Sequence, residues 1–154
     1  MLWQETPRRL YLVTGQDLGP GERRLPGRWL ARLGQAEPGN DQRTTEAVLE
    51  AVRSREFADC PARAQCCFAC LSEEDAVGFA VEFGRLGHIY EVTSGAERVF
   101  VADMRWFSAV RALPATAEQS ARSYWAGVRH PRGVLLEVLV PGDLTVSSRV
   151  RDIG

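Results

Sequence analysis

The feature that most constrains the fold is a run of eight residues, Gly133–Val140, in which every residue except Glu137 is apolar or glycine. A run this short and this rich in valine and leucine is typical of a strand covered on both faces, so it predicts a central strand of a sheet. A carboxylate in such a strand is costly unless it is paired or hydrogen-bonded. Either Glu137 faces the rim of the sheet or pairs with an arginine, or it lies at the floor of a cleft and contacts a ligand there.

Hydrophobic periodicity and turn residues predict the other elements. The predicted strands are 9–14, 65–71, 88–93, 98–101 and a last strand from 144, and the predicted helices are 44–57, 72–84, 103–113 and 116–127. Because strands and helices are mixed without regular alternation, we expect an α+β fold with a split, mostly antiparallel sheet and flanking helices. The length, 154 residues, favours a single domain over 1–154.

Local signals refine these elements. Ser72 and Asp103 are expected to cap helices, as is Thr116 with Gln119 as a capping-box partner. In the helix over 44–57, Glu46 is expected on the polar side. The segment 15–39 is rich in glycine and proline, which predicts a long loop with one turn of helix around Trp29–Leu33.

The composition excludes several activities. All 19 basic residues are arginine, so no lysine can form a Schiff base or bind phosphate in a P-loop. Aldolase, pyridoxal-phosphate and P-loop kinase chemistry are therefore excluded. Arginines outnumber acids by six to three in residues 1–35 and by five to three in 121–154, which predicts a modestly basic face if the two ends meet. Without a signal peptide or an apolar stretch of membrane length, we expect a cytoplasmic protein with no membrane partner.

Four cysteines lie within eleven residues: Cys60, Cys66, Cys67 and Cys70. A single CxxC pair is weak evidence for zinc, and strand alternation would place Cys67 and Cys70 on opposite faces. We therefore expect no metal site but reduced thiols that fill a core strand, with an enzyme built on the cysteine cluster as the alternative. Arg63 precedes this strand and suits either a fork for a phosphate or carboxylate, or a surface salt bridge to Asp59 or Glu56.

Several short motifs, taken in order, resemble those of small bacterial domains in the ADP-ribosyltransferase-like superfamily. They are Leu10–Thr14 followed by Gly21-Glu22 and Pro26-Gly27, Pro61-Ala62-Arg63 with Phe68, Ser72-x-Glu74-Asp75-Ala76, Ile89–Val92, Tyr124-Trp125-x-Gly127, and Glu137–Gly142. The last segment is similar to the final strand of those domains, which carries a single catalytic glutamate. The match spans nearly the whole chain, although each motif is short.

The resemblance implies a split sheet that grips NAD, as a substrate, in its central cleft. It implies an NAD-dependent mono-ADP-ribosyltransferase of toxin or phage-defence type, with an antitoxin as a further partner. Glu137 would be catalytic, because a carboxylate can bind a ribose hydroxyl and offset the positive charge of the transition state. Arg63 would hold the pyrophosphate, and Tyr11, Phe68 or Tyr124 would stack on nicotinamide.

Two departures from the superfamily pattern change these expectations. Leu12 stands where a histidine or arginine usually contacts the NAD ribose, so either Thr14, Tyr11 or backbone groups take over that contact, or NAD binding is impaired. The second outcome would make the chain a catalytically inactive binding or interaction module. Leu135 stands where protein-modifying members often carry glutamate or glutamine, which favours nucleic acid over protein as the macromolecular acceptor.

Overall fold

The computed structural model describes residues 3–35 and 40–154, and its strands form two four-stranded antiparallel sheets. The first sheet has the order β1 (Trp3–Glu5), β6 (Arg98–Asp103), β7 (Leu136–Val140) and β4 (Cys67–Ala69). The second has the order β2 (Leu10–Thr14), β5 (Gly87–Thr93), β8 (Leu144–Ile153) and β3 (Arg23–Arg24). The expected α+β class with a split antiparallel sheet is confirmed.

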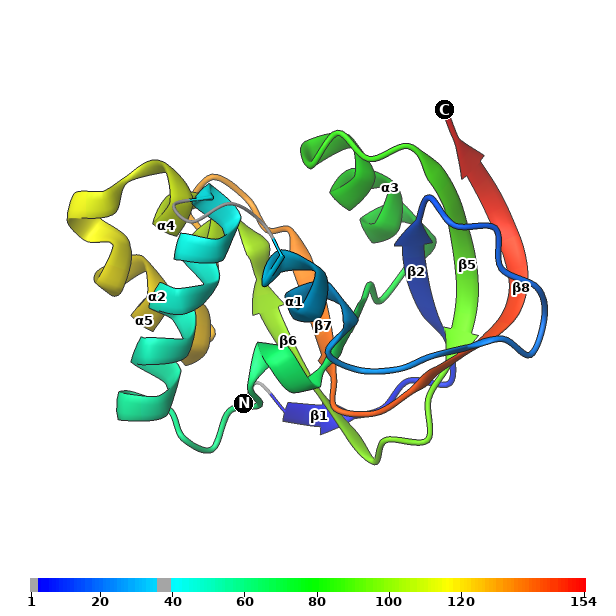
Figure 1. Ribbon diagram of the computed structural model, residues 1–154, viewed down its shortest axis with the longest axis horizontal. Helices are drawn as coiled ribbons and strands as arrows, with labels where there is room; N and C mark the ends of the chain where they lie inside the picture. Colours follow the sequence, from blue (N-terminus) through cyan, green and yellow to red (C-terminus); the bar gives the residue numbers. More distant parts are fainter. Residues whose placement is uncertain (1–2, 36–39) are drawn as a thin grey trace.

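The helices lie unevenly around the two sheets (Figure 1). Five are present in the described residues: α1 (Arg28–Leu33), α2 (Asp41–Glu56), α3 (Glu73–Glu82), α4 (Met104–Ala112) and α5 (Ala117–Ala126). Helices α2, α4 and α5 pack against one another beside β6 and β7, whereas α3 packs on β2 and β5. Two short 3-10 turns, Arg63–Gln65 and Pro114–Thr116, join these elements.

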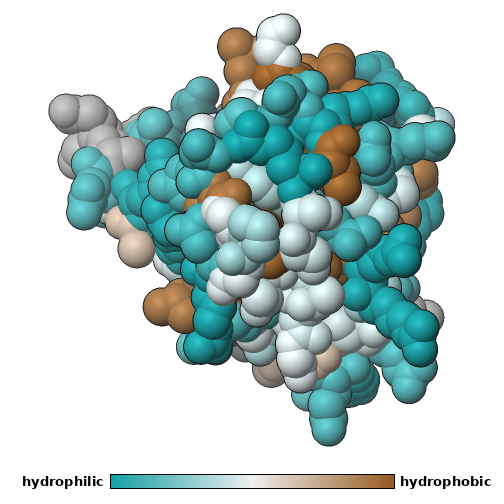
Figure 2. Space-filling model, turned by 90° about the vertical axis from the view of Figure 1, so that its right-hand side faces the viewer, coloured by the Kyte–Doolittle hydropathy of each residue, from teal (hydrophilic) through white to brown (hydrophobic). Residues whose placement is uncertain are grey.

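The apolar core has three parts: one under the helices, one between the sheets, and a small one formed by Cys70, Ala76 and Ile89 where α3 packs on the second sheet. The first part joins the inner sides of α2, α4 and α5 to β6 and β7, with Trp125, Tyr124 and Phe100 as its largest buried side chains. The second part joins β2, β5 and β8 to the facing side chains of β4, β6 and β7. The side of the molecule that carries β8, at the right of Figure 1, faces the viewer in Figure 2 and shows mostly hydrophilic and neutral groups.

Strand β7 is central, as predicted, because β6 pairs with one edge and β4 with the other. It is shorter than the predicted strand and begins only at Leu136. Val134 is exposed, and the backbone N–H of Leu135 donates to the Asp103 carboxylate instead of a neighbouring strand. The buried carboxylate of Asp103 also accepts from the N–H of His130, so it fixes the loop that leads into β7.

The helix caps agree with the sequence in two of three cases. Ser72 accepts a hydrogen bond from the N–H of Asp75, and Asp103 accepts one from Arg105. The capping box at Thr116 is wrong: its side chain makes no cap bond, because a 3-10 turn precedes the helix and the hydroxyl donates to the Leu113 carbonyl there. Helix α2 starts before the predicted position because the Asn40 side chain accepts from the N–H groups of residues 42 and 43.

The segment 15–39 contains more structure than predicted, although residues 36–39 lie outside the described residues. Helix α1 occupies the predicted helical turn, and β3 adds a short pairing with β8 that the sequence did not reveal. The first and last thirds of the chain do meet, because β2, β3 and β8 belong to one sheet. Within the described residues, no helix has both the length and the apolar character needed to cross a membrane.

Candidate functional site

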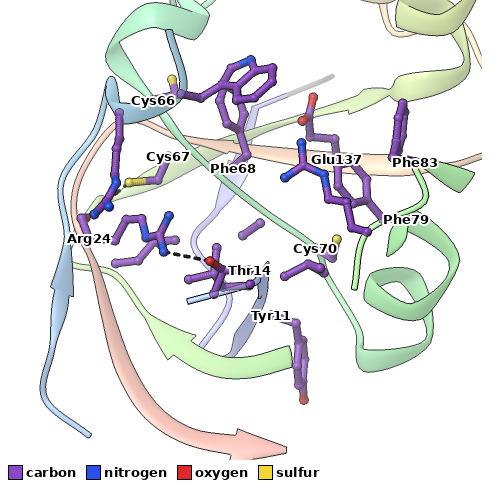
Figure 3. Close-up of a pocket in the computed structure, with 18 of the residues that line it drawn as sticks. Tyr11, Thr14, Arg24, Cys66, Cys67, Phe68, Cys70, Phe79, Phe83 and Glu137 are labelled. Carbon is purple, nitrogen blue, oxygen red and sulfur yellow. Dashed lines mark hydrogen bonds between the residues drawn. The ribbon is translucent and has the colours of Figure 1, made fainter. Parts of the chain in front are cut away.

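A cavity of about 540 Å³ opens between the two sheets, a size typical of small-molecule sites. Strands β2, β4 and β7 form much of its floor, and α1, α3 and the start of α4 contribute side chains to its walls. Figure 3 shows Thr14, Phe68 and Glu137 around this space, whereas the ring of Tyr11 points away from it and packs beside Ile89. All four were predicted as site residues from the sequence, and the fold brings them together from three strands.

Glu137 lies at the floor of the cavity and is 2% exposed. Its Oε2 accepts a hydrogen bond from Arg63 Nη1 at 2.7 Å and from the Tyr124 hydroxyl at 3.2 Å. Within the described residues, both hydrogen bonds that Glu137 accepts go to this one oxygen, so Oε1 is left to accept from a ligand. The two alternatives from the sequence are therefore combined, because Glu137 is paired with an arginine and also lines a cleft.

Arg63 is the centre of a buried network of charged groups. Its Nε donates to Glu46 Oε1 at 2.6 Å, and its Nη1 donates to the Tyr124 hydroxyl at 2.6 Å as well as to Glu137. Its guanidinium carbon lies 4.6 Å from the centre of the Phe68 ring, a cation–π distance. The predicted surface salt bridge to Asp59 or Glu56 is wrong, because Arg63 points inward and is 5% exposed.

Glu46 is a site residue that sequence reasoning placed on the wrong side of its helix. It is 5% exposed and pairs with Arg63, and its second oxygen accepts from the Trp29 indole N–H at 3.1 Å. The register of α2 turns this carboxylate inward, and no local pattern in the sequence indicates that. Through Trp29 the network reaches α1, so the helix over the cavity is joined to the carboxylate at its floor.

The burial of these groups changes their ionisation. Burial raises the pKa of the Glu137 carboxyl, and the positive charge of Arg63 opposes that effect. Burial also raises the pKa of the Tyr124 hydroxyl well above its ordinary value. Burial alone would lower the pKa of Arg63, but the carboxylates of Glu137 and Glu46 hold this pKa well above its ordinary value. The guanidinium therefore stays charged, and its charge favours the ionised form of Glu137 against the effect of burial.

Tyr124 differs from the other predicted site residues. It is fully buried and is not part of the cavity wall, so its ring has no face open to a ligand. Its hydroxyl instead accepts from Arg63 and donates to Glu137, which fixes the carboxylate from behind. Tyr124 is thus placed to position Glu137 and not to stack on a bound ring.

The cavity is also lined by four arginines that the sequence did not identify as site residues. They are Arg24 on β3, Arg28 and Arg32 on α1, and Arg85 after α3, and we call them the cavity arginines. Arg24 donates to the Thr14 hydroxyl at 3.2 Å, drawn in Figure 3, and to the Gln16 side chain at 2.8 Å. Leu12 lines the same cavity. The arrangement gives the cavity an anion-binding wall.

Three of the four cysteines also belong to the cavity wall, namely Cys66, Cys67 and Cys70, and we call them the cavity thiols. All four cysteines are free, and the cavity thiols are buried. Burial raises the pKa of Cys66 to about 12, that of Cys67 to about 11 and that of Cys70 to about 12. They are therefore protonated near neutral pH, which makes them poor nucleophiles.

A comparison with protein families gives one match. A family model described as "Protein of unknown function (DUF2441)" matches residues 39–152. The matched range contains the whole buried network of Glu46, Arg63, Tyr124 and Glu137, and it leaves out α1 and β2. No curated protein matches the chain.

Proposed function

Because the chain belongs to the DUF2441 family, whose description assigns no activity, we propose a function from the site itself: an NAD-dependent mono-ADP-ribosyltransferase with an ADP-ribosyltransferase-like fold. The observation that carries the proposal is Glu137, a buried carboxylate in a central strand with one oxygen fixed and the other facing a cavity. Burying a charge in this way is costly, and a binding or catalytic role accounts for its presence.

In the proposed reaction the bond between the nicotinamide nitrogen and ribose C1′ breaks, and nicotinamide leaves with the electron pair. Positive charge develops on the ribose, and an acceptor nucleophile forms the new bond to C1′ and loses its proton. Glu137 Oε1 would accept a hydrogen bond from a ribose hydroxyl and offset the positive charge. Arg63 and Tyr124 hold Oε2, so the carboxylate needs no reorientation during the reaction.

The rest of the cavity offers the contacts that NAD requires. Aromatic side chains that include Phe68 and Phe79 form walls on which the nicotinamide ring would stack. The cavity arginines would bind the pyrophosphate. They replace Arg63 in this expected role, because the Nε and Nη1 of Arg63 already donate to protein groups. Thr14 and Arg24 would supply the polar contacts that Leu12 lacks. We propose nucleic acid as the favoured acceptor because Leu135 lacks a polar group before the catalytic strand.

A second candidate is a catalytically inactive binding or interaction module of the same fold, in which NAD binding is impaired. Leu12 favours it, because an apolar side chain stands where the ribose contact is expected. The Arg63–Glu137 pair also favours it, since a carboxylate held by a cation is a weaker base. This candidate binds neither NAD nor ADP-ribose and carries out no transfer.

The two candidates are separated by measuring binding and transfer on the same protein. Calorimetric titration with NAD gives binding, and labelled NAD incubated with DNA, RNA and protein fractions gives transfer. We expect Glu137→Gln, which keeps the size of the side chain, to lower transfer by about 10²-fold or more. No binding of NAD or ADP-ribose by the unsubstituted protein would favour the inactive module and overturn the transferase, whereas binding of NAD together with transfer would overturn the inactive module.

A further inference from the structure

The cavity has more positive charge than an NAD pyrophosphate needs. Besides Arg63, which its two carboxylates neutralise, four cavity arginines line it against the single carboxylate of Glu137. Within residues 3–35 and 40–154, none of these four forms an ion pair with an acid. Arg24 has only neutral partners, the Thr14 hydroxyl and the Gln16 amide. Four cations are thus open to a ligand.

Three of the six arginines in residues 1–35, namely Arg24, Arg28 and Arg32, line this cavity. Outside it, arginines from both ends meet acids: Arg9 pairs with Glu91, Arg23 with Asp143, Arg149 with Asp17, and Arg151 with Glu73. These pairs cancel much of the basic face predicted from the sequence. The cavity arginines lack such partners, which points to an enclosed anionic ligand and not to an extended polyanion lying on the sheet.

The cavity arginines lie at both ends of the cavity. The guanidinium carbon of Arg85 is 5.5 Å from the centre of the Trp29 ring, and Trp29 donates to Glu46 in the network that holds Glu137. Arg28 and Arg32 are four residues apart on α1 and therefore lie on the same side of it, and Arg24 lies on β3 shortly before Arg28. Figure 3 shows Glu137 and Arg24 on different sides of the cavity. Arg85 is therefore at the Glu137 end, and Arg24, followed along the chain by Arg28 and Arg32, is at the other end.

This arrangement matches the phosphate groups of an extended dinucleotide. With the reacting ribose at Glu137, the pyrophosphate comes next, beside Arg85. The adenosine ribose then reaches Arg28 and Arg24, where NAD has no charge. A phosphate monoester carries about −1.5 to −2 charge at neutral pH and would pair with these two arginines.

We propose that the preferred dinucleotide carries an additional phosphate monoester on its adenosine ribose, as NADP does, and that Arg28 and Arg24 select it. The inference rests on the proposed function, because the position of the reacting ribose at Glu137 sets the direction of the ligand. It concerns the end of the cavity away from Glu137, whereas the proposed reaction takes place at Glu137.

The test is calorimetric titration of the full chain with NAD and with NADP at fixed moderate salt. We expect NADP to bind about tenfold tighter or more, since one charge-assisted hydrogen bond is of that size. Arg28→Ala should remove most of this preference and change NAD affinity much less. Arg111→Ala, which removes an arginine near the end of α4 outside the cavity, is the matched control and should leave the preference unchanged.

Each outcome decides the proposal. Equal affinity for NAD and NADP would overturn it and leave the proposed function standing, whereas binding of neither would overturn both. A preference for NADP that persists in Arg28→Ala would show general attraction and would overturn the role of this residue. Competition by adenosine 2′-monophosphate but not by inorganic phosphate supports a nucleotide site, and equal competition by both overturns it.

Discussion

Replacing Arg63 by methionine should destabilise the fold strongly, because it leaves two buried carboxylates without their cation. Arg63 pairs with Glu46 and Glu137 at 2.6 and 2.7 Å, and all three side chains are almost fully buried. Breaking a buried pair by removing one partner costs about 3–5 kcal/mol. For a domain of this size that lowers the melting temperature by roughly 6–20 °C.

The same change should introduce a pH dependence whose sign follows from the buried acids. Burial already raises the pKa of Glu137, and loss of Arg63 removes the main group that opposes this. A carboxyl whose folded pKa is above its unfolded value costs stability at high pH, and the cost disappears as the pH falls towards the unfolded pKa. The destabilisation should therefore be smaller at pH 5 than at pH 8.

Urea unfolding of the Arg63→Met variant at both pH values gives the free energy of unfolding directly. Arg122→Met is the matched control, because Arg122 pairs with Glu56 on the surface and its loss should have little effect. A loss of less than about 1 kcal/mol at pH 8, or the same loss at both pH values, would refute the buried network as the source of stability.

Two further predictions concern the cavity walls. The cavity thiols should resist Ellman's reagent in the folded protein at pH 8 and react at once in denaturant, and equal rates in both states would contradict their burial. Their folded pKa values exceed the unfolded value of about 8.5, so the free energy of unfolding should fall above that pH by up to about 1.4 kcal/mol per pH unit for each thiol. Urea unfolding at pH 8 to 10 measures this fall. Gly27→Ala should cost about 1–3 kcal/mol and weaken nucleotide binding, because Gly27 has φ of +83° and a Cβ would lie 2.7 Å from the Ala64 carbonyl oxygen. Gly95→Ala is its control, with open space around the added Cβ, and equal stability of the two variants would contradict this account.

The sequence predicted the parts of the fold that depend on local patterns. The apolar run around Glu137 indicated a central strand, and the caps at Ser72 and Asp103 indicated where helices begin. It failed where a distant segment decides the outcome. The two-residue strand β3 exists only through its pairing with β8, and the strand propensity of its own residues does not indicate that pairing.

The candidate site divides in the same way. Glu137 was predictable because a charge in an apolar strand is a local anomaly, and its environment then confirmed that it lies in a cavity. Glu46 and the cavity arginines could not be predicted as site residues, because each lies in a segment where charged residues are common. Only the packing of α2 and α1 over the sheets turns them inward. The sequence showed an excess of arginine at the chain ends, but it did not show which of these arginines line the cavity.

The network explains why the residue at position 63 has to be arginine and why α1 matters to Glu137. A guanidinium donates from Nε to Glu46 and from Nη1 to Glu137 in fixed directions, while its flat face rests on the Phe68 ring. A lysine has a single ammonium group and cannot hold two carboxylates in this planar geometry. Because Glu46 also accepts from Trp29, any ligand that moves α1 acts on the same hydrogen bonds that orient Glu137. In the proposed function, nucleotide binding at the cavity arginines and the chemistry at Glu137 would therefore be joined by the hydrogen bonds of Trp29, Glu46 and Arg63.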